Sequence, residues 1–177
     1  MARRTTAVAA NVGYRGAAMA TTMPSVEQLD AALQGFDRLY GLKLLAVSDE
    51  EVEACATVRP ELLQPAGLVH GGVYAAIAES VASMATAFAV IPNGEMAMGL
   101  SNSTSFLRPI TAGTIHARAV RVHRGSTTWV WDVTFTDDAG HTCAITRMTI
   151  AVRPPRPGQV PPARLAEQAA ASGGDQG

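Results

Sequence analysis

The stretch LLQPAGLVHGGVYAAIAESVAS, residues 62–83, places one carboxylate, Glu79, among residues that are otherwise mostly apolar or small. From residue 70 to residue 91 the chain consists mainly of Ala, Val, Ile, Met and Phe, without proline. A helix that is apolar around most of its circumference is buried on most sides. The stretch therefore predicts a buried helix over residues 70–91, and its glutamate needs a partner or a function because an unpaired buried charge is costly.

Segments before and after this helix alternate between apolar and polar residues, which is typical of half-buried strands. A short amphipathic helix is predicted first, from a Ser25 cap to a stop at Gly41. The long helix then requires a sheet that can cover it. The pattern predicts an α+β fold in which a curved antiparallel sheet wraps one apolar helix, with the last four strands forming a meander. The predicted strands cover residues 51–58, 96–108, 113–123, 127–138 and 142–152.

Composition predicts one domain with irregular ends. Residues 25–152 carry the fold, residues 1–24 form a disordered leader, and the Pro-, Ala- and Gly-rich residues 153–177 form a disordered tail. The 14 basic and 15 acidic residues include no basic run, which argues against nucleic acid or a membrane surface as partner. We expect a cytoplasmic protein, because no apolar run has the length of a signal or membrane-spanning segment.

Cysteine and histidine residues do not suggest a metal site or a disulfide. Cys55 and Cys143 lie far apart in alternating segments and are interpreted as reduced core residues. His116, His123 and His141 lie on predicted strands or turns without the spacing of metal ligands. The sequence therefore predicts no metal centre.

The glycine pair at the start of the long helix has chemical consequences. A helix that begins at Gly71 and Gly72 presents unpaired backbone N–H groups at its positive end, and glycine lets a ligand carbonyl approach closely. Thioester hydrolysis needs such donors for the carbonyl oxygen, together with a carboxylate that attacks or activates water. Glu79 is the candidate carboxylate, and Ser83 lies four residues on, where its hydroxyl shares a helix face with Glu79.

Helix geometry predicts that one chain does not complete this site. Gly71 and Glu79 are eight residues apart. At the usual rise per residue they are separated by about 12 Å, too far to act on one thioester carbon. Two copies with antiparallel long helices would bring the glutamate of one to the glycine amides of the other. A homodimer with two equivalent sites is therefore predicted.

At these residues the chain resembles a known family over roughly residues 40–152. The motif consists of Gln64, the HGG sequence at residues 70–72, Glu79 and Ser83. It resembles that of the hot-dog fold acyl-CoA thioesterases, in the group related to phenylacetate-pathway and enterobactin-proofreading enzymes. The resemblance implies hydrolysis of a small aromatic or short- to medium-chain acyl-CoA. It implies no cofactor, since coenzyme A is part of the substrate, and a homodimer that often doubles into a tetramer.

The resemblance also implies a role for each residue of the motif. Glu79 would be the nucleophile or general base, while the Gly71 amide and His70 would polarise the thioester carbonyl. Ser83 would position the hydrolytic water. Gln64 would hold the loop or the substrate where the chain approaches the helix.

Further residues are predicted to bind substrate. By resemblance, Met84 would line the acyl pocket. Phe106 occupies the place where relatives acting on hydroxylated aromatic acyl groups often carry histidine, which favours a plainer acyl group. Arg108, Arg124 and Ser126 are candidates for the coenzyme A phosphates, because the HRGS turn offers arginine and backbone donors.

Other interpretations of the same residues remain open. Glu79 could be a structural carboxylate, the glycine pair could permit close packing, Ser83 could be a small helix-contact residue, and Gln64 could bond only to its own loop. Two further function classes are a hot-dog dehydratase or hydratase and a non-catalytic acyl-CoA-binding protein. The dehydratase signatures of a histidine before Phe-Pro-Gly and of a Met-Pro-Gly helix start are absent from the sequence.

Overall fold

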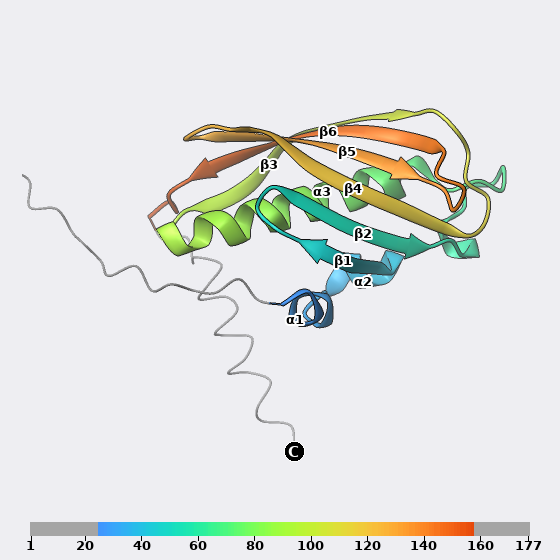
Figure 1. Ribbon diagram of the computed structural model, residues 1–177, viewed down its shortest axis with the longest axis horizontal. Coiled ribbons are helices and arrows are strands. Elements are labelled where there is room, and N and C mark those ends of the chain that lie inside the picture. Colours follow the sequence, from blue (N-terminus) through green and yellow to red (C-terminus); the bar gives the residue numbers. More distant parts are fainter. Residues whose placement is uncertain (1–24, 158–177) are drawn as a thin grey trace, which may run out of the picture.

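The computed structural model describes residues 25–157. They form a six-stranded antiparallel sheet, in the order β1-β2-β4-β5-β6-β3, that curves around the long helix α3 (Gly71–Val90), as Figure 1 shows. This is the predicted α+β hot-dog architecture. The predicted leader and the predicted tail beyond residue 157 lie outside the described residues. The strands are β1 (Leu42–Val47), β2 (Glu51–Thr57), β3 (Met96–Phe106), β4 (Thr114–Arg124), β5 (Thr128–Thr136) and β6 (Thr142–Arg153).

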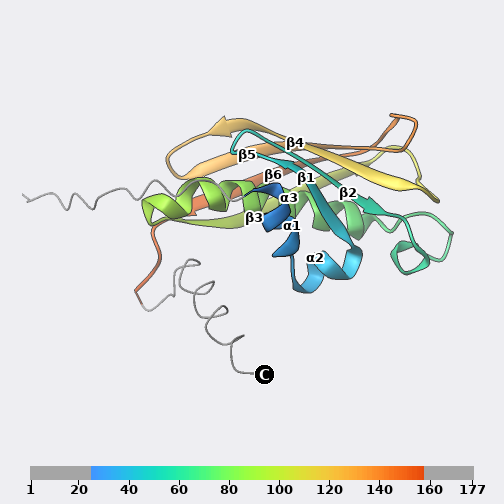
Figure 2. The ribbon, with the colours of Figure 1, turned by 60° about the horizontal axis from the view of Figure 1, so that its bottom comes forward.

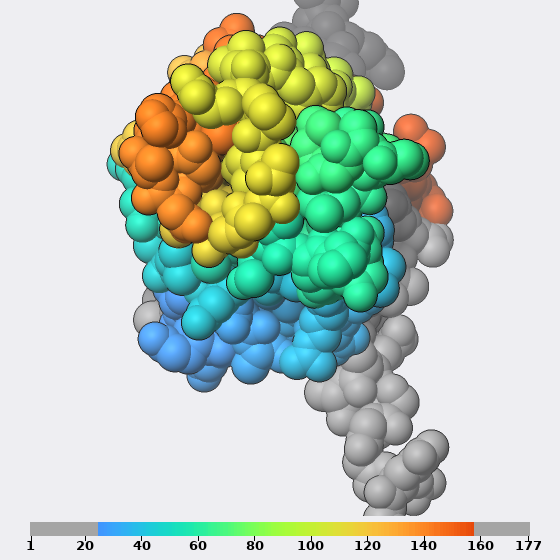
Figure 3. Space-filling model, turned by 90° about the vertical axis from the view of Figure 1, so that its right-hand side faces the viewer, coloured from blue at the N-terminus to red at the C-terminus, as the bar shows by residue number. Residues whose placement is uncertain are grey.

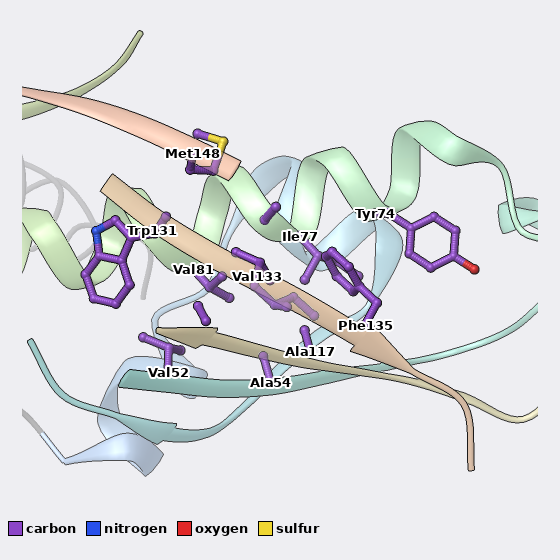
Figure 4. Close-up of a cluster of buried hydrophobic side chains, with 14 of the residues drawn as sticks. Val52, Ala54, Tyr74, Ile77, Val81, Ala117, Trp131, Val133, Phe135 and Met148 are labelled. Carbon is purple, nitrogen blue, oxygen red and sulfur yellow. The ribbon is translucent and has the colours of Figure 1, made fainter. Parts of the chain in front are cut away.

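One side of α3 packs into the concave face of the sheet. Ile77 and Val81 are fully buried beside β5 residues such as Val133 in the core cluster of Figure 4. The helix is long and apolar enough to match a membrane span by length and composition, a test that buried core helices also pass. The predicted burial on most sides is only partly correct, because Glu79 on the opposite side is exposed in the single chain.

The predicted first helix is divided in two. Ser25 caps α1 (Val26–Ala31) as predicted, and its hydroxyl and the Gln28 side chain form a capping box. A separate helix, α2 (Gly35–Tyr40), follows after a short turn (Figure 2). Gly35 has a φ of 57°, a left-handed conformation that a continuous right-handed helix does not contain. The sequence pattern also missed β1, the edge strand that begins directly after α2.

The predicted four-strand meander is correct for β4, β5 and β6 and wrong for β3. β3 pairs with β6, and β4 pairs with β2 on one side and with β5 on the other. The link over residues 107–113 is too long for a tight hairpin, and its Ile110 carbonyl accepts a hydrogen bond from the Val69 N–H just before α3. This link therefore crosses the end of the molecule, so β3 and β4, consecutive in sequence, are not neighbours in the sheet.

β3 forms an edge of the sheet with one side of its backbone unpaired within the described chain. Its middle residues are exposed, including the apolar Met98 and Leu100. The register with β6 shifts between Gly99 and Ser101, opposite the middle of α3. A long exposed edge strand with apolar side chains is a ready surface for pairing with another chain.

Candidate active site

The first turn of α3 leaves one backbone donor free. His70 is the N-cap, and its Nδ1 accepts a hydrogen bond from the Gly72 N–H at 2.9 Å. The His70 carbonyl accepts from the Val73 N–H, also at 2.9 Å. The Gly71 N–H has no partner within residues 25–157. An unpaired N–H at the positive end of a helix is suited to bind an electron-rich oxygen.

The cap also orients the His70 imidazole. Because Nδ1 accepts a hydrogen bond, a neutral ring carries its proton on Nε2. The side chain is largely exposed, and the described chain provides no partner for Nε2. His70 can therefore offer a second N–H donor beside Gly71.

A pocket of about 490 Å³ opens beside the Gly71 amide. Figure 3 views this end of the molecule, where the green segment near residues 60–70 adjoins the yellow segment near 107–113. Gln64 and Arg108 both line the pocket; in the described chain the Gln64 side chain has no hydrogen-bond partner and Arg108 has no ion-pair partner. The lining is Gln64, Leu68, Val69, Gly71, Tyr74, Phe106, Leu107, Arg108 and Pro109.

The Phe106 ring lies directly against Gly71. A Cβ atom at Gly71 would lie 2.7 Å from Cζ of the Phe106 ring, well inside van der Waals contact. The ring thus rests directly on the glycine beside the free amide, and it is itself 59% exposed. The structure brings Gln64, Gly71, Phe106 and Arg108 into one pocket, whereas His70 and Gly72 line a separate pocket at the helix start.

Glu79 lies two turns farther along α3 on an exposed face. Its Oε1 accepts a hydrogen bond from the Ser83 hydroxyl at 2.9 Å, the contact expected from their spacing. Across from it, the backbone of β3 carries Gly99, where even an added Cβ would lie 3.4 Å from Oε1. The Ser83 hydroxyl therefore holds the carboxylate, and no side chain at residue 99 covers it.

One chain does not bring the carboxylate to the amide. Gly71 and Glu79 belong to the same unbroken helix, so their separation of about 12 Å follows from the regular helical rise. Met84, one turn beyond Glu79, packs partly against the core and is not part of the pocket beside Gly71. Within the single chain the predicted catalytic set is thus divided between two places on α3.

Arg124 and Ser126 lie at the other end of the molecule, at the β4–β5 turn (Figure 1). The Arg124 guanidinium lies 4.8 Å from the Trp129 ring centroid, and its Nη1 is 3.1 Å from Oδ2 of Asp49. Its charge already has a partner. Of the three residues predicted for coenzyme A phosphates, Arg108 alone lies in the pocket beside Gly71.

A second pocket, of about 480 Å³, lies on the other side of the helix start. Sequence patterns did not predict it, because α2 supplies much of its wall. The Tyr40 hydroxyl donates to Asp37 and also contacts Ser80, which ties α2 to α3, and burial raises its pKa. The lining is Phe36, Leu39, Tyr40, Arg59, Glu61, Leu62, His70, Gly72 and Val73.

Sequence reasoning also missed Tyr74. This side chain is 3% exposed and lines the pocket beside Gly71. Burial raises the pKa of its hydroxyl from 10.0 to about 12. The available signal was a lone phenol in the first turn of an otherwise apolar helix. Within residues 25–157, no three His, Cys, Asp or Glu side chains are grouped as a metal site would require.

Comparison with known proteins identifies the family. Residues 66–144, which include the helix start and Glu79, match the thioesterase superfamily. A 1,4-dihydroxy-2-naphthoyl-CoA hydrolase of Listeria monocytogenes is 32% identical over 122 residues, which are 69% of this chain and 98% of the relative. The chain belongs to the thioesterase superfamily. The proofreading thioesterase EntH of Cronobacter turicensis is 30% identical over 112 residues, 63% of this chain and 81% of that protein.

A solved structure agrees with this assignment. A mutant thioesterase of Pseudomonas aeruginosa superposes with a TM-score of 0.71 at 35% identity, covering 76% of this chain and 97% of that one. The predicted resemblance to hot-dog thioesterases of the phenylacetate-pathway and proofreading group is thereby confirmed. The protein is a thioester hydrolase of this family, whose members act on acyl-CoA substrates.

Proposed function

We propose that this thioesterase hydrolyses a small aromatic or short- to medium-chain acyl-CoA to the free acid and coenzyme A. The observation that carries the proposal is the unpaired Gly71 amide, which opens into a pocket at the start of α3. The exposed Glu79 carboxylate, held by Ser83, supplies the second requirement of thioester cleavage. The name of the Listeria relative supports an aromatic acyl group.

In the proposed reaction the thioester carbonyl oxygen accepts hydrogen bonds from the Gly71 N–H and from Nε2 of His70. These donors stabilise the negative charge that develops on the oxygen as the carbonyl carbon becomes tetrahedral. Glu79 either attacks that carbon directly or removes a proton from an attacking water placed by Ser83. The carbon–sulfur bond then breaks, coenzyme A leaves as the thiolate, and water supplies the oxygen of the acid.

We further propose that the active site is shared by two copies of the chain, and that two such dimers associate. The separation of Gly71 from Glu79 along one helix supports this proposal, because the carboxylate of the same chain lies about 12 Å from the amide. The unpaired edge of β3, with Met98 and Leu100 exposed on it, offers the surface on which a second copy could continue the sheet. Pairing there would also set the exposed face of α3 near its counterpart.

For coenzyme A, the proposal uses Arg108 as the phosphate contact. It lines the pocket beside Gly71 and has no ion-pair partner in the described chain, whereas Arg124 is bound to Asp49. Contacts of a substrate with Arg124, Ser126 and Met84 remain predictions, and only a dimer could bring these residues to it. Phe106 would line the acyl side of the pocket.

The test is thiol release from a panel of aromatic, short-chain and medium-chain acyl-CoAs. Glu79→Ala is expected to lower kcat by at least about 10²-fold, the usual contribution of a general base. Glu53→Ala, which removes an exposed glutamate on the outer side of β2, is the matched control and should retain activity. Equal activity of Glu79→Ala and the parent would refute the mechanism. Binding without hydrolysis by the parent would favour an acyl-CoA-binding protein.

Complementation tests the shared site. Gly71→Pro removes the amide donor, and Glu79→Ala removes the carboxylate. Neither homodimer therefore has an intact site. A mixed dimer has one site with both groups and one with neither. Chains mixed in equal amounts, unfolded and refolded together should regain about a quarter of the parent activity, since half of the dimers are mixed. Activity no greater than the sum of the two variants would exclude a shared site.

A further inference from the structure

Tyr74 carries a buried polar group that the proposed reaction does not use. The residue is 3% exposed, and its hydroxyl is the one buried side-chain N or O atom without a hydrogen-bond partner in residues 25–157. Buried polar groups are nearly always paired, and an unpaired one calls for an explanation. A ligand group that completes the bond is one such explanation.

The Tyr74 ring is held at a fixed place in the wall of the pocket. It meets Phe135 edge to face, with ring centroids 5.3 Å apart, and Phe106 at 6.1 Å. Figure 4 shows the hydroxyl pointing away from the other labelled core side chains. Gln64 and Gly71 line the same pocket as Tyr74, and the unpaired hydroxyl is buried in its wall.

Phe106 covers this region in the single chain. Its ring rests on Gly71 and faces Tyr74, and 59% of the residue is exposed. An acyl group that displaces the ring would gain access to both the Gly71 amide and the interior beside Tyr74. The acyl group, rather than the charged phosphates of coenzyme A, is the part of the substrate suited to this buried location.

We propose that the Tyr74 hydroxyl donates a hydrogen bond to an oxygen on the acyl group, so that the enzyme selects acyl-CoAs carrying a hydroxyl or keto oxygen beyond the thioester. This inference rests on the proposed function and assigns specificity within the same site. It replaces the expectation of a plainer acyl group that Phe106, in place of a histidine, suggested. The high pKa of the buried phenol keeps it protonated at neutral pH, as a donor must be. A site that hydrogen-bonds a substrate oxygen discriminates strongly against an analogue that lacks it.

The test compares the parent with Tyr74→Phe on benzoyl-CoA and the three hydroxybenzoyl-CoA isomers, and on hexanoyl-CoA and its hydroxy derivative. For the best oxygenated substrate, kcat/KM should fall about tenfold in Tyr74→Phe, as for loss of one hydrogen bond. The unsubstituted esters should change less than about twofold because they never made that bond. The melting temperature of the ligand-free variant should be equal to or above that of the parent, since Phe removes an unpaired buried group.

Three results would overturn the assignment. Equal losses with all esters would place the bond on the thioester or coenzyme A, which every substrate shares. An unchanged preference would show that Tyr74 does not read the acyl group. A lower melting temperature of the ligand-free variant would show that the hydroxyl has a structural partner.

Failure of the proposed function is distinguishable from failure of this inference. If the parent hydrolyses none of the esters, calorimetry on the same pairs decides the role of Tyr74 through binding alone. Tyr74→Phe should then bind the hydroxylated ester about tenfold more weakly and the plain ester equally. Equal binding of both esters by both proteins would refute the inference.

Discussion

The two halves of α3 differ in whether their buried polar side chains are hydrogen-bonded. In the C-terminal half, Thr86 is completely buried, and its hydroxyl donates to the Ala82 carbonyl at 2.8 Å. The same oxygen accepts from Nε1 of the buried Trp131 at 2.9 Å. In the N-terminal half, the equally buried Tyr74 has an unpaired hydroxyl. The same helix thus pairs its polar groups fully at one end and leaves a donor open at the other.

The backbone shows the same contrast. At the C-terminal end the chain continues into the 3-10 turn η2 (Ile91–Asn93), and Gly94, with a φ of 75°, lets its N–H bond to the Ile91 carbonyl. At the N-terminal end His70 satisfies Gly72 but not Gly71. Complete pairing supports stability, whereas the donors left open are those that face the pocket. The difference therefore separates groups that stabilise the fold from groups available to a substrate.

The largest expected effect comes from removing the open backbone donor. Gly71→Pro eliminates the N–H at the first helical position, which proline tolerates. The preceding residue, His70, has φ −64° and ψ 132°, a conformation that suits a residue before proline. We expect kcat to fall about 10²- to 10³-fold relative to Gly71→Ala, as for other oxyanion donors.

Gly71→Ala is the matched control, because both substitutions place a Cβ against Phe106 and only proline removes the donor. Circular dichroism and thermal melts of both variants would confirm that the helix start is intact. Similar kcat values for the two folded variants would mean that the Gly71 amide takes no part in catalysis. The two halves of α3 would then differ in structure without a consequence for the reaction.

The next effect is on the free energy of unfolding, compared between variants of the hydrogen-bonded Thr86 and the unpaired Tyr74. Thr86→Val keeps the branched shape but leaves the buried Trp131 N–H without its acceptor. We expect the free energy of unfolding to fall by about 1–3 kcal/mol, as for other buried groups left unpaired. Tyr74→Phe should leave it unchanged or raise it by about 1 kcal/mol, because no bond is lost. Urea unfolding of the ligand-free proteins measures both.

A matched control for Thr86→Val is Thr134→Val, on an exposed position of β5, where the same chemical change affects no buried partner. Its free energy of unfolding should remain close to that of the parent. If Thr86→Val were as stable as the parent, or Tyr74→Phe clearly less stable, the contrast between the two halves of α3 would not hold.

The smallest expected effect is on the free energy of unfolding at alkaline pH. Burial raises the pKa of Tyr74 from 10.0 to about 12, so the folded state keeps a proton that the unfolded chain releases. The associated stability is present below pH 10 and is lost as the pH rises toward 12. At pH 11 the loss attributable to Tyr74 should be about 1 kcal/mol. Tyr74→Phe should lack this component.

Unfolding curves at several pH values, with tyrosine absorbance followed in parallel, would measure this loss of stability above pH 10. Tyr40→Phe is a useful comparison, because burial and Asp37 raise the pKa of that tyrosine as well. A parent and a Tyr74→Phe protein with identical pH dependence above pH 10 would show that Tyr74 titrates as an ordinary tyrosine.

Much of the sheet was predictable because its strands alternate regularly. Val52, Ala54 and Ala56 of β2 are buried as their spacing indicated. The position of β3 was not predictable from such local patterns. Alternation specifies which face of a strand is buried but not which strand lies beside it.

The candidate site was predicted in part for a similar reason. Glu79 and Ser83 are four residues apart on one helix, so their contact follows from helical geometry. Phe106 meets Gly71 because β3 passes the start of α3, which depends on the strand order. Arg108 and Arg124 looked equivalent in sequence, yet their strand ends lie at opposite ends of the molecule.

The sequence by itself determined the apolar helix, the glycine pair at its start and the carboxylate two turns along it, because each of these follows from local spacing. Only the tertiary structure decided that the Gly71 amide is the donor left open and that the Tyr74 hydroxyl is left without a partner. The physical reason is that hydrogen-bond pairing depends on groups that come from distant parts of the chain. An unpaired donor is defined by neighbours, and neighbours in space are set by the fold.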